Sequence, residues 1–88
     1  MDVSYSPTFV RMFKALPEAL QDEVIEKIEV FKDSANHKAL KVHKLSGRLK
    51  DRYSFSVNYK TRIVFTHLNR EHREACLLAV GDHAVYDR

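Results

Sequence analysis

The chain has 88 residues, of which 44% are hydrophobic and 31% are charged, and its formal net charge is +3. A chain of this length forms one domain around one small core, so several independent domains are excluded. No apolar run approaches the roughly 18 residues of a membrane span, and the N-terminus has no signal-peptide pattern. The single cysteine, Cys76, rules out an internal disulfide and fits a reducing compartment. We therefore expect one soluble, cytoplasmic domain over residues 1–88.

The N-terminal third predicts a short strand followed by two helices. Residues 2–5 alternate between polar and apolar, which indicates a brief strand. Ser6-Pro7 is a helix start, with Ser6 as N-cap and Pro7 at the first helical position. Leu16 precedes Pro17 and is pushed out of the α region, so the first helix is short and Pro17 opens the second. The second helix should end near residues 33–34. Its apolar stripe consists of Leu20, Val24, Ile28 and Phe31, widened by Ile25.

The remainder of the chain predicts three strands. Residues 53–59 alternate between apolar and polar, as a half-buried strand does, and residues 58–61 indicate a hairpin turn. Residues 62–68 are rich in β-forming side chains. Residues 75–80 are apolar throughout, which suits a strand covered on both faces. The order β-α-α-β-β-β predicts an α+β fold, with a small, mostly antiparallel sheet and an N-terminal helical hairpin packed on one face. The opposite face should carry Ser54, Ser56 and Arg62.

Positive charge is concentrated in residues 38–62. This stretch holds eight Lys or Arg and one acid, Asp51, so its formal charge is +7 and the rest of the chain sums to −4. Such a concentration, with aromatic residues at its far end, indicates a surface that binds a polyanion; a solvated charged face is the alternative. The candidate RNA-binding residues are Lys41, Lys44, Arg48, Lys50, Arg52 and Lys60.

Three motifs follow this pattern of elements: HKLSG at residues 43–47, YKTRIVF at 59–65 and GDHAVY at 81–86. In this order, and over nearly the whole chain, they resemble the RelE/ParE superfamily of toxins from type II toxin–antitoxin systems. The resemblance implies a microbial RNase fold. In the RelE-like branch it implies a metal-independent, cofactor-free endoribonuclease, an mRNA interferase that cleaves translated mRNA on the ribosome and inhibits translation. The implied partners are mRNA, ribosomal RNA and a cognate antitoxin protein.

Carried over residue by residue, the resemblance implies catalytic roles for Arg62, His83, Tyr86 and His43. Ser54 and Ser56 stand where RelE carries lysines, so the pattern is closer to the YafQ-like branch. The spacing from His83 to Tyr86 is also shorter than in many relatives. ParE-like members share the fold, lack the RNase residues and poison DNA gyrase. A gyrase-inhibiting or catalytically inactive binding toxin is therefore the alternative.

The residue types suit RNA cleavage on chemical grounds as well. A base must take the 2′-OH proton, an acid must protonate the leaving 5′ oxygen, and cations must surround the phosphate. Histidine titrates at about pH 6.5, and arginine holds two phosphate oxygens with its fork. Structural roles stay open: Arg62 as a surface ion pair with Asp82 or Glu74, and Tyr86 as a cap on the core. The remaining histidines, interpreted as structural or solvated, are His37, His67 and His72.

Overall fold

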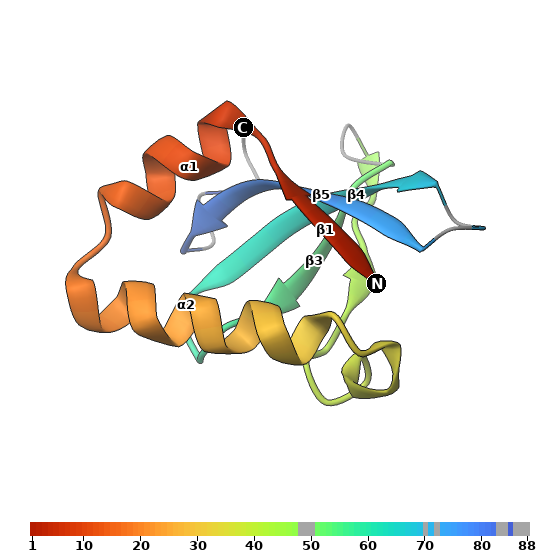
Figure 1. Ribbon diagram of the computed structural model, residues 1–88, viewed down its shortest axis with the longest axis horizontal. Helices are drawn as coiled ribbons and strands as arrows, with labels where there is room; N and C mark the ends of the chain where they lie inside the picture. Colours follow the sequence, from red (N-terminus) through yellow and green to blue (C-terminus); the bar gives the residue numbers. More distant parts are fainter. Residues whose placement is uncertain (48–50, 70, 72, 83–84, 86–88) are drawn as a thin grey trace.

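The computed structural model describes residues 1–47, 51–69, 71, 73–82 and 85. The described residues form two α-helices, one short 3-10 helix and five strands in succession (Figure 1). They are β1 (Asp2–Tyr5), α1 (Pro7–Lys14), α2 (Glu18–Phe31), η1 (Ser34–Asn36), β2 (His43–Lys44), β3 (Tyr53–Ser56), β4 (Arg62–Asn69) and β5 (Glu74–Gly81). The predicted α+β class is confirmed.

The five strands form one sheet of order β1-β5-β4-β3-β2. Neighbours from β2 to β5 pair antiparallel, whereas β1 pairs parallel with β5, from Asp2 opposite Glu74 to Tyr5 opposite Leu77. The mostly antiparallel sheet is as predicted. The two-residue strand β2 was not predicted and forms one edge of the sheet.

Polar side chains hold the helical hairpin in place. The Ser6 hydroxyl accepts a hydrogen bond of 3.0 Å from the backbone N–H of Phe9 and donates one of 3.1 Å to the carbonyl of Leu78, so the predicted N-cap also ties α1 to β5. At the corner between the helices, Gln21 Nε2 donates to the carbonyls of Phe13 and Leu16 at 3.2 and 3.0 Å. These bonds give further donors to carbonyls at the end of α1, where the regular helical hydrogen bonds end.

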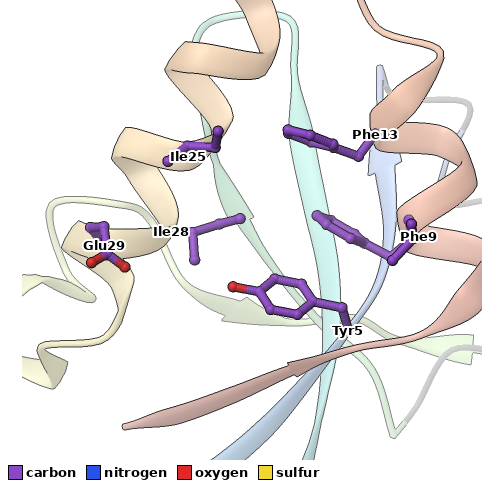
Figure 2. Close-up of a pocket in the computed structure, with 7 residues that line it drawn as sticks. Tyr5, Phe9, Phe13, Ile25, Ile28 and Glu29 are labelled. Atoms are coloured by element: carbon purple, nitrogen blue, oxygen red, sulfur yellow. The ribbon is translucent and has the colours of Figure 1, made fainter.

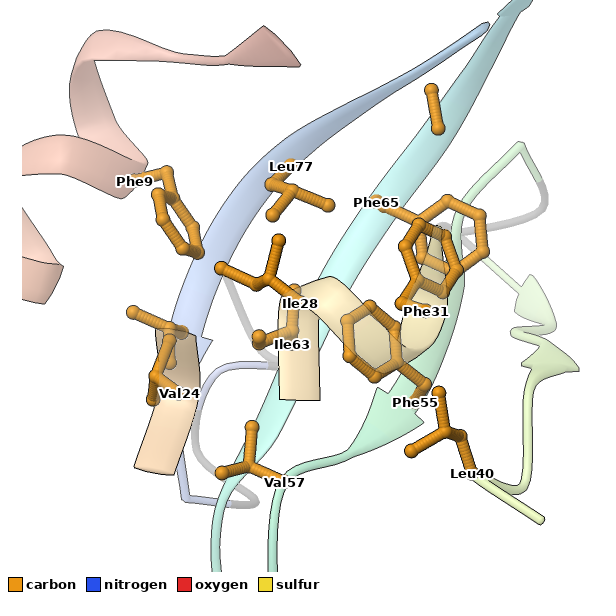
Figure 3. Close-up of a cluster of buried hydrophobic side chains, with 12 residues drawn as sticks. Phe9, Val24, Ile28, Phe31, Leu40, Phe55, Val57, Ile63, Phe65 and Leu77 are labelled. Carbon is orange, nitrogen blue, oxygen red and sulfur yellow. The ribbon is translucent and has the colours of Figure 1, made fainter. Parts of the chain in front are cut away.

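The core lies between α2 and one face of the sheet (Figure 3). Phe31 of α2 is fully buried; its ring stacks on Phe55 at 4.3 Å and meets Phe65 edge-on at 4.8 Å between centroids. Phe55 and Phe65 therefore point toward the helix. Because strand side chains alternate between faces, Ser54, Ser56, Arg62 and Val64 lie on the opposite face, as the sequence predicts for the first three.

Strand β3 is shorter than the predicted strand over residues 53–59. The N–H of Val57 bonds the carbonyl of Thr61 at 2.9 Å, and Asn58 Oδ1 accepts from the N–H groups of Lys60 and Thr61 at 2.9 and 2.8 Å. These bonds fold residues 57–61 into a turn, because an Asn side chain substitutes for a backbone acceptor there. The hairpin turn predicted at residues 58–61 is thus confirmed, and Tyr59 is 89% exposed in it.

Candidate functional site

Part of the basic stretch folds as a β-hairpin along the sheet edge. In this hairpin His43 lies opposite Ser54 and Lys44 opposite Tyr53, and the Leu45 N–H bonds the Arg52 carbonyl at 2.9 Å. The Thr66 hydroxyl donates to the Asp51 carbonyl at 3.0 Å, which ties the hairpin loop to β4. The described cations of this stretch that were predicted to bind RNA are Lys41, Lys44, Arg52 and Lys60, and all four are exposed.

Two predicted catalytic residues, His43 and Arg62, share the face of the sheet that points away from α2; we call it the outer face. His43 lies across from Ser54, which lies across from Val64, while Arg62 lies across from Ser56. Two strand spacings and two residues along the strand separate the Cα atoms of His43 and Arg62 by about 12 Å. The catalytic roles of both residues stay predictions.

Arg62 is half-buried, and its guanidinium turns toward the β3–β4 turn. Nη1 donates to the carbonyl of Asn58 and, at 3.1 Å, to that of Thr61. The ion pair with Glu74 that the sequence left open is excluded, because Arg62 lies opposite Gly81 whereas Glu74 lies opposite Asn69 at the far end of both strands. A separation of seven strand residues exceeds about 20 Å.

His43 is held by groups from its own turn and from β3. Its Nδ1 lies 2.8 Å from the carbonyl oxygen of Lys41, and its Nε2 lies 3.5 Å from Ser54 Oγ. Ser54 is completely buried, although strand alternation alone places it on a solvent-facing surface. This burial could not be predicted from the sequence, because the short strand β2 that lies beside Ser54 was itself not predicted.

An apolar patch lies beside these residues on the outer face. Val64 and Ala79, opposite each other on β4 and β5, are buried together with Val85, and Leu45 packs against them. A cavity of about 260 Å³ borders this patch; it is lined by Ser6, Thr8, Arg52, Val64, Leu78, Ala79 and Val85. The outer face thus combines an apolar patch with the exposed Arg52 at the edge of that patch.

Four predicted site residues, Arg48, Lys50, His83 and Tyr86, lie outside the described residues. Of the C-terminal GDHAVY motif, the structure describes Gly81, Asp82 and Val85, and Val85 packs on the outer face.

The described histidines that were interpreted as structural make ring contacts. His37 stacks on Phe31 at 4.8 Å, and His67 meets Tyr53 edge-on at 4.7 Å between centroids. Within the described part of the chain, no three His, Cys, Asp or Glu side chains gather to hold a metal. No described helix is long and apolar enough to cross a membrane.

A second candidate surface is an apolar groove between the helices, which we call the hairpin groove (Figure 2). Phe9 and Phe13 of α1 face Ile25 and Ile28 of α2, with Tyr5 at one end, around a volume of about 230 Å³. Ile25 is 51% exposed and Tyr5 is 45% exposed. Ile25 was visible in the sequence only as a residue that widens the stripe of the second helix.

Comparison with solved structures shows that the chain shares its fold with RelE, YafQ and a YoeB/ParE toxin. The chain is 19% identical to a chain of the toxin–antitoxin complex RelBE2 from Mycobacterium tuberculosis, with a TM-score of 0.74 and coverage of 93% of this chain and 96% of that one. The archaeal RelE–RelB complex from Pyrococcus horikoshii gives 18% identity, a TM-score of 0.70 and 92% of each chain. YafQ from Escherichia coli gives 13% identity, a TM-score of 0.70, 97% of this chain and 96% of that one.

The similarity is one of fold rather than of sequence. Neither the protein-family models nor the curated proteins give a match to this chain. The resemblance drawn from the three sequence motifs is thus confirmed by three-dimensional structure, at the level of the fold.

Proposed function

We propose that this protein is the toxin of a toxin–antitoxin pair, and that it is an endoribonuclease that cleaves translated mRNA on the ribosome. The shared fold with RelE and YafQ supports the toxin assignment. Fold alone does not determine activity, so the nuclease assignment depends on the site. The observation that carries it is that His43 and Arg62 share the outer face, with the exposed cations Lys41 and Arg52 nearby.

In this proposal the 2′ oxygen of the RNA attacks the adjacent phosphorus after losing its proton to a histidine. The new 2′-O–P bond replaces the P–O5′ bond, and the leaving 5′ oxygen takes a proton from a second acid, which leaves a cyclic phosphate and a 5′-hydroxyl. His43 and His83 would carry the two proton transfers, Arg62 would stabilise the phosphate, and Tyr86 would stack on a base.

The placement of Arg62 is compatible with its proposed role. The two carbonyls of the β3–β4 turn engage only Nη1, whereas a guanidinium has further donors on Nε and Nη2. The bonds to Asn58 and Thr61 restrict the movement of the side chain. A guanidinium that is already restrained loses less conformational freedom when it binds a phosphate.

We further propose that the cognate antitoxin inserts apolar side chains into the hairpin groove. RelBE2 and RelE–RelB were solved as complexes with partners of this kind. The groove exposes Ile25 and Tyr5, and a contiguous apolar surface of this kind marks an interaction site. An antitoxin segment that folds on binding would also cover the exposed cations of the β2–β3 hairpin, provided that it contains acidic residues.

A binding toxin of the same fold, directed at gyrase or catalytically inactive, is the second candidate. It is favoured by Ser54 and Ser56, which stand where the resemblance implies lysines, and by the complete burial of Ser54. Neither residue supplies a cation to the outer face.

Induced expression in bacteria, with mapping of mRNA 5′ ends, separates the two candidates. The nuclease predicts codon-phased cuts inside reading frames that are lost in a His43→Gln, Arg62→Ala control. Intact mRNA accompanied by DNA damage would instead identify a gyrase inhibitor.

A further inference from the structure

The contacts of His43 determine which of its two nitrogens carries the proton. A carbonyl oxygen accepts hydrogen bonds and cannot donate them, so the ring nitrogen 2.8 Å from the Lys41 oxygen must carry a hydrogen. In a neutral imidazole the other nitrogen then holds a lone pair. The 3.5 Å approach of Ser54 Oγ to Nε2 is longer than an ordinary O–H···N hydrogen bond, so Lys41 is the stronger determinant.

The Lys41 carbonyl is presented by a turn with an uncommon backbone conformation. Lys41 has φ +59°, in the left-handed region that non-glycine residues occupy at a cost of about 1 kcal/mol. The neighbouring residue holds the turn in place: Leu40 is buried, and its carbonyl accepts the N–H of Ser56 on β3 at 2.9 Å. On the other side, the Val42 N–H bonds the His37 carbonyl at 3.0 Å. The direction of the Lys41 carbonyl is therefore set by the core and the sheet.

We propose that the Lys41 turn holds His43 in the tautomer protonated on Nδ1, which makes Nε2 the nitrogen that exchanges a proton with RNA. The tautomer is inferred from the geometry alone. The proton exchange between Nε2 and RNA rests on the proposed nuclease function. Lys41 acts here as a positioning residue through its backbone. Its side-chain charge, proposed to bind RNA, is a separate contribution. Nε2, the ring nitrogen of His43 that lies beside Ser54 on the same face as Arg62, is then the reactive nitrogen.

The tautomer is measurable without RNA, by two-bond ¹H–¹⁵N correlation spectra of the ¹⁵N-labelled full chain. Spectra are recorded at about pH 8, above the usual histidine titration, and a His43→Gln variant assigns the His43 signals. We expect the Nδ1–H pattern, the reverse of the form that free histidine favours in water. A predominant Nε2–H pattern in the wild-type protein overturns the proposal.

Two substitutions at the same position separate backbone from charge. Lys41→Gly removes the charge and tolerates positive φ, whereas Lys41→Val removes the same charge and disfavours positive φ. We expect the Nδ1–H tautomer to persist in the glycine variant and to be depleted in the valine variant, with cleavage about 10-fold slower in the valine variant than in the glycine variant. Equal tautomer populations in the two folded variants count against the role of the turn. If the valine variant does not fold, the wild-type and glycine spectra still decide.

Ser54→Ala is the control for the second contact, and it should retain the Nδ1–H pattern. A switch of tautomer in this variant would assign the effect to Ser54 and overturn the role of Lys41. The outcomes also separate this inference from the proposed function. If the protein has the Nδ1–H tautomer but cuts no mRNA, the nuclease is refuted and the tautomer assignment stands. If the protein cuts mRNA but has the Nε2–H tautomer, the tautomer assignment is refuted and the nuclease stands.

Discussion

The guanidinium of Arg62 is hydrogen-bonded to the backbone of Asn58, four residues earlier, across the turn that ends β3. The same nitrogen donates to Thr61 at 3.1 Å. A residue proposed to hold a phosphate is thus also part of the scaffold of its own hairpin. Substitutions at this position should therefore lower stability as well as the proposed activity, and the two effects must be measured separately.

Replacing Arg62 with alanine should lower mRNA cleavage about 100-fold, because a preorganised cation beside the phosphate is lost. Loss of the two bonds to the turn should also lower the free energy of unfolding by about 1–2 kcal/mol. Denaturant unfolding and cleavage of ribosome-bound mRNA check the two effects. Arg62→Lys is the matched variant, since it keeps the charge and loses the fork. An alanine variant that is folded and cuts at the wild-type rate would remove Arg62 from the site.

Arg62 and His83 are proposed to serve one transition state, so their losses should not multiply. Each single alanine variant should lose about 100-fold in cleavage, and the double variant should lose much less than the product of the two. Single-turnover cleavage rates of the two single variants and the double variant measure this coupling. Fully multiplicative losses would show that the residues act independently.

Reversing Lys41 and Lys44 to glutamate should weaken ribosome binding and flatten its dependence on salt. If each lysine contacts one phosphate, the slope of log affinity against log salt falls in magnitude by about 1–2. Binding titrations at several salt concentrations give the slope. Lys14→Glu with Lys27→Glu is the control, because it makes the same change of net charge on the helical hairpin. An identical effect of both pairs would indicate net charge and not a specific surface.

The two serines of β3 should respond differently to lysine. Ser54 is completely buried, so Ser54→Lys must bury a charge or break the β2–β3 pairing, and we expect a loss of about 3 kcal/mol or more in unfolding free energy. Ser56 is half-buried, and Ser56→Lys should cost less than about 1 kcal/mol and strengthen RNA binding. Unfolding curves and RNA titrations compare the variants. Equal stability of both would contradict the burial of Ser54.

A charge in the hairpin groove should abolish antitoxin binding and leave the fold intact. Ile25 is 51% exposed, so Ile25→Lys removes apolar contact area without opening a core cavity. Leu68→Lys is the matched control, since Leu68 is 60% exposed and lies on β4, outside the groove. Co-purification with the product of the neighbouring reading frame, and relief of toxicity by it, are the readouts. Retained binding by the Ile25 variant would place the partner elsewhere.

Local sequence patterns predict most of this fold. The Ser6-Pro7 start, the break before Pro17 and the β-forming residues of β4 act within a few residues, and the structure confirms each one. Strand β2 was missed because two residues show no periodicity, and its pairing depends on β3, ten residues further along the chain. The parallel pairing of β1 with β5 likewise leaves no local signal.

The candidate site was less predictable than the fold. The register that brings Arg62 and His43 to one face follows from alternation once the strands are known. The burial of Ser54 and the left-handed turn at Lys41 cannot be predicted from alternation, because both depend on how the hairpin packs against the sheet. Neither residue type indicates such a role.

The parallel pairing of β1 with β5 has a consequence for biosynthesis. Strand β1 is translated before its partner in the sheet, which begins at Glu74, 72 residues after Asp2. Contacts of such large sequence separation close late and slow the folding reaction. A nascent chain that has emerged only as far as β4 lacks β5, the strand that joins β1 to the sheet. Strand β5 also contains Ala79, which is part of the apolar patch of the outer face. Such a partly emerged chain therefore has neither the complete sheet nor the complete outer face.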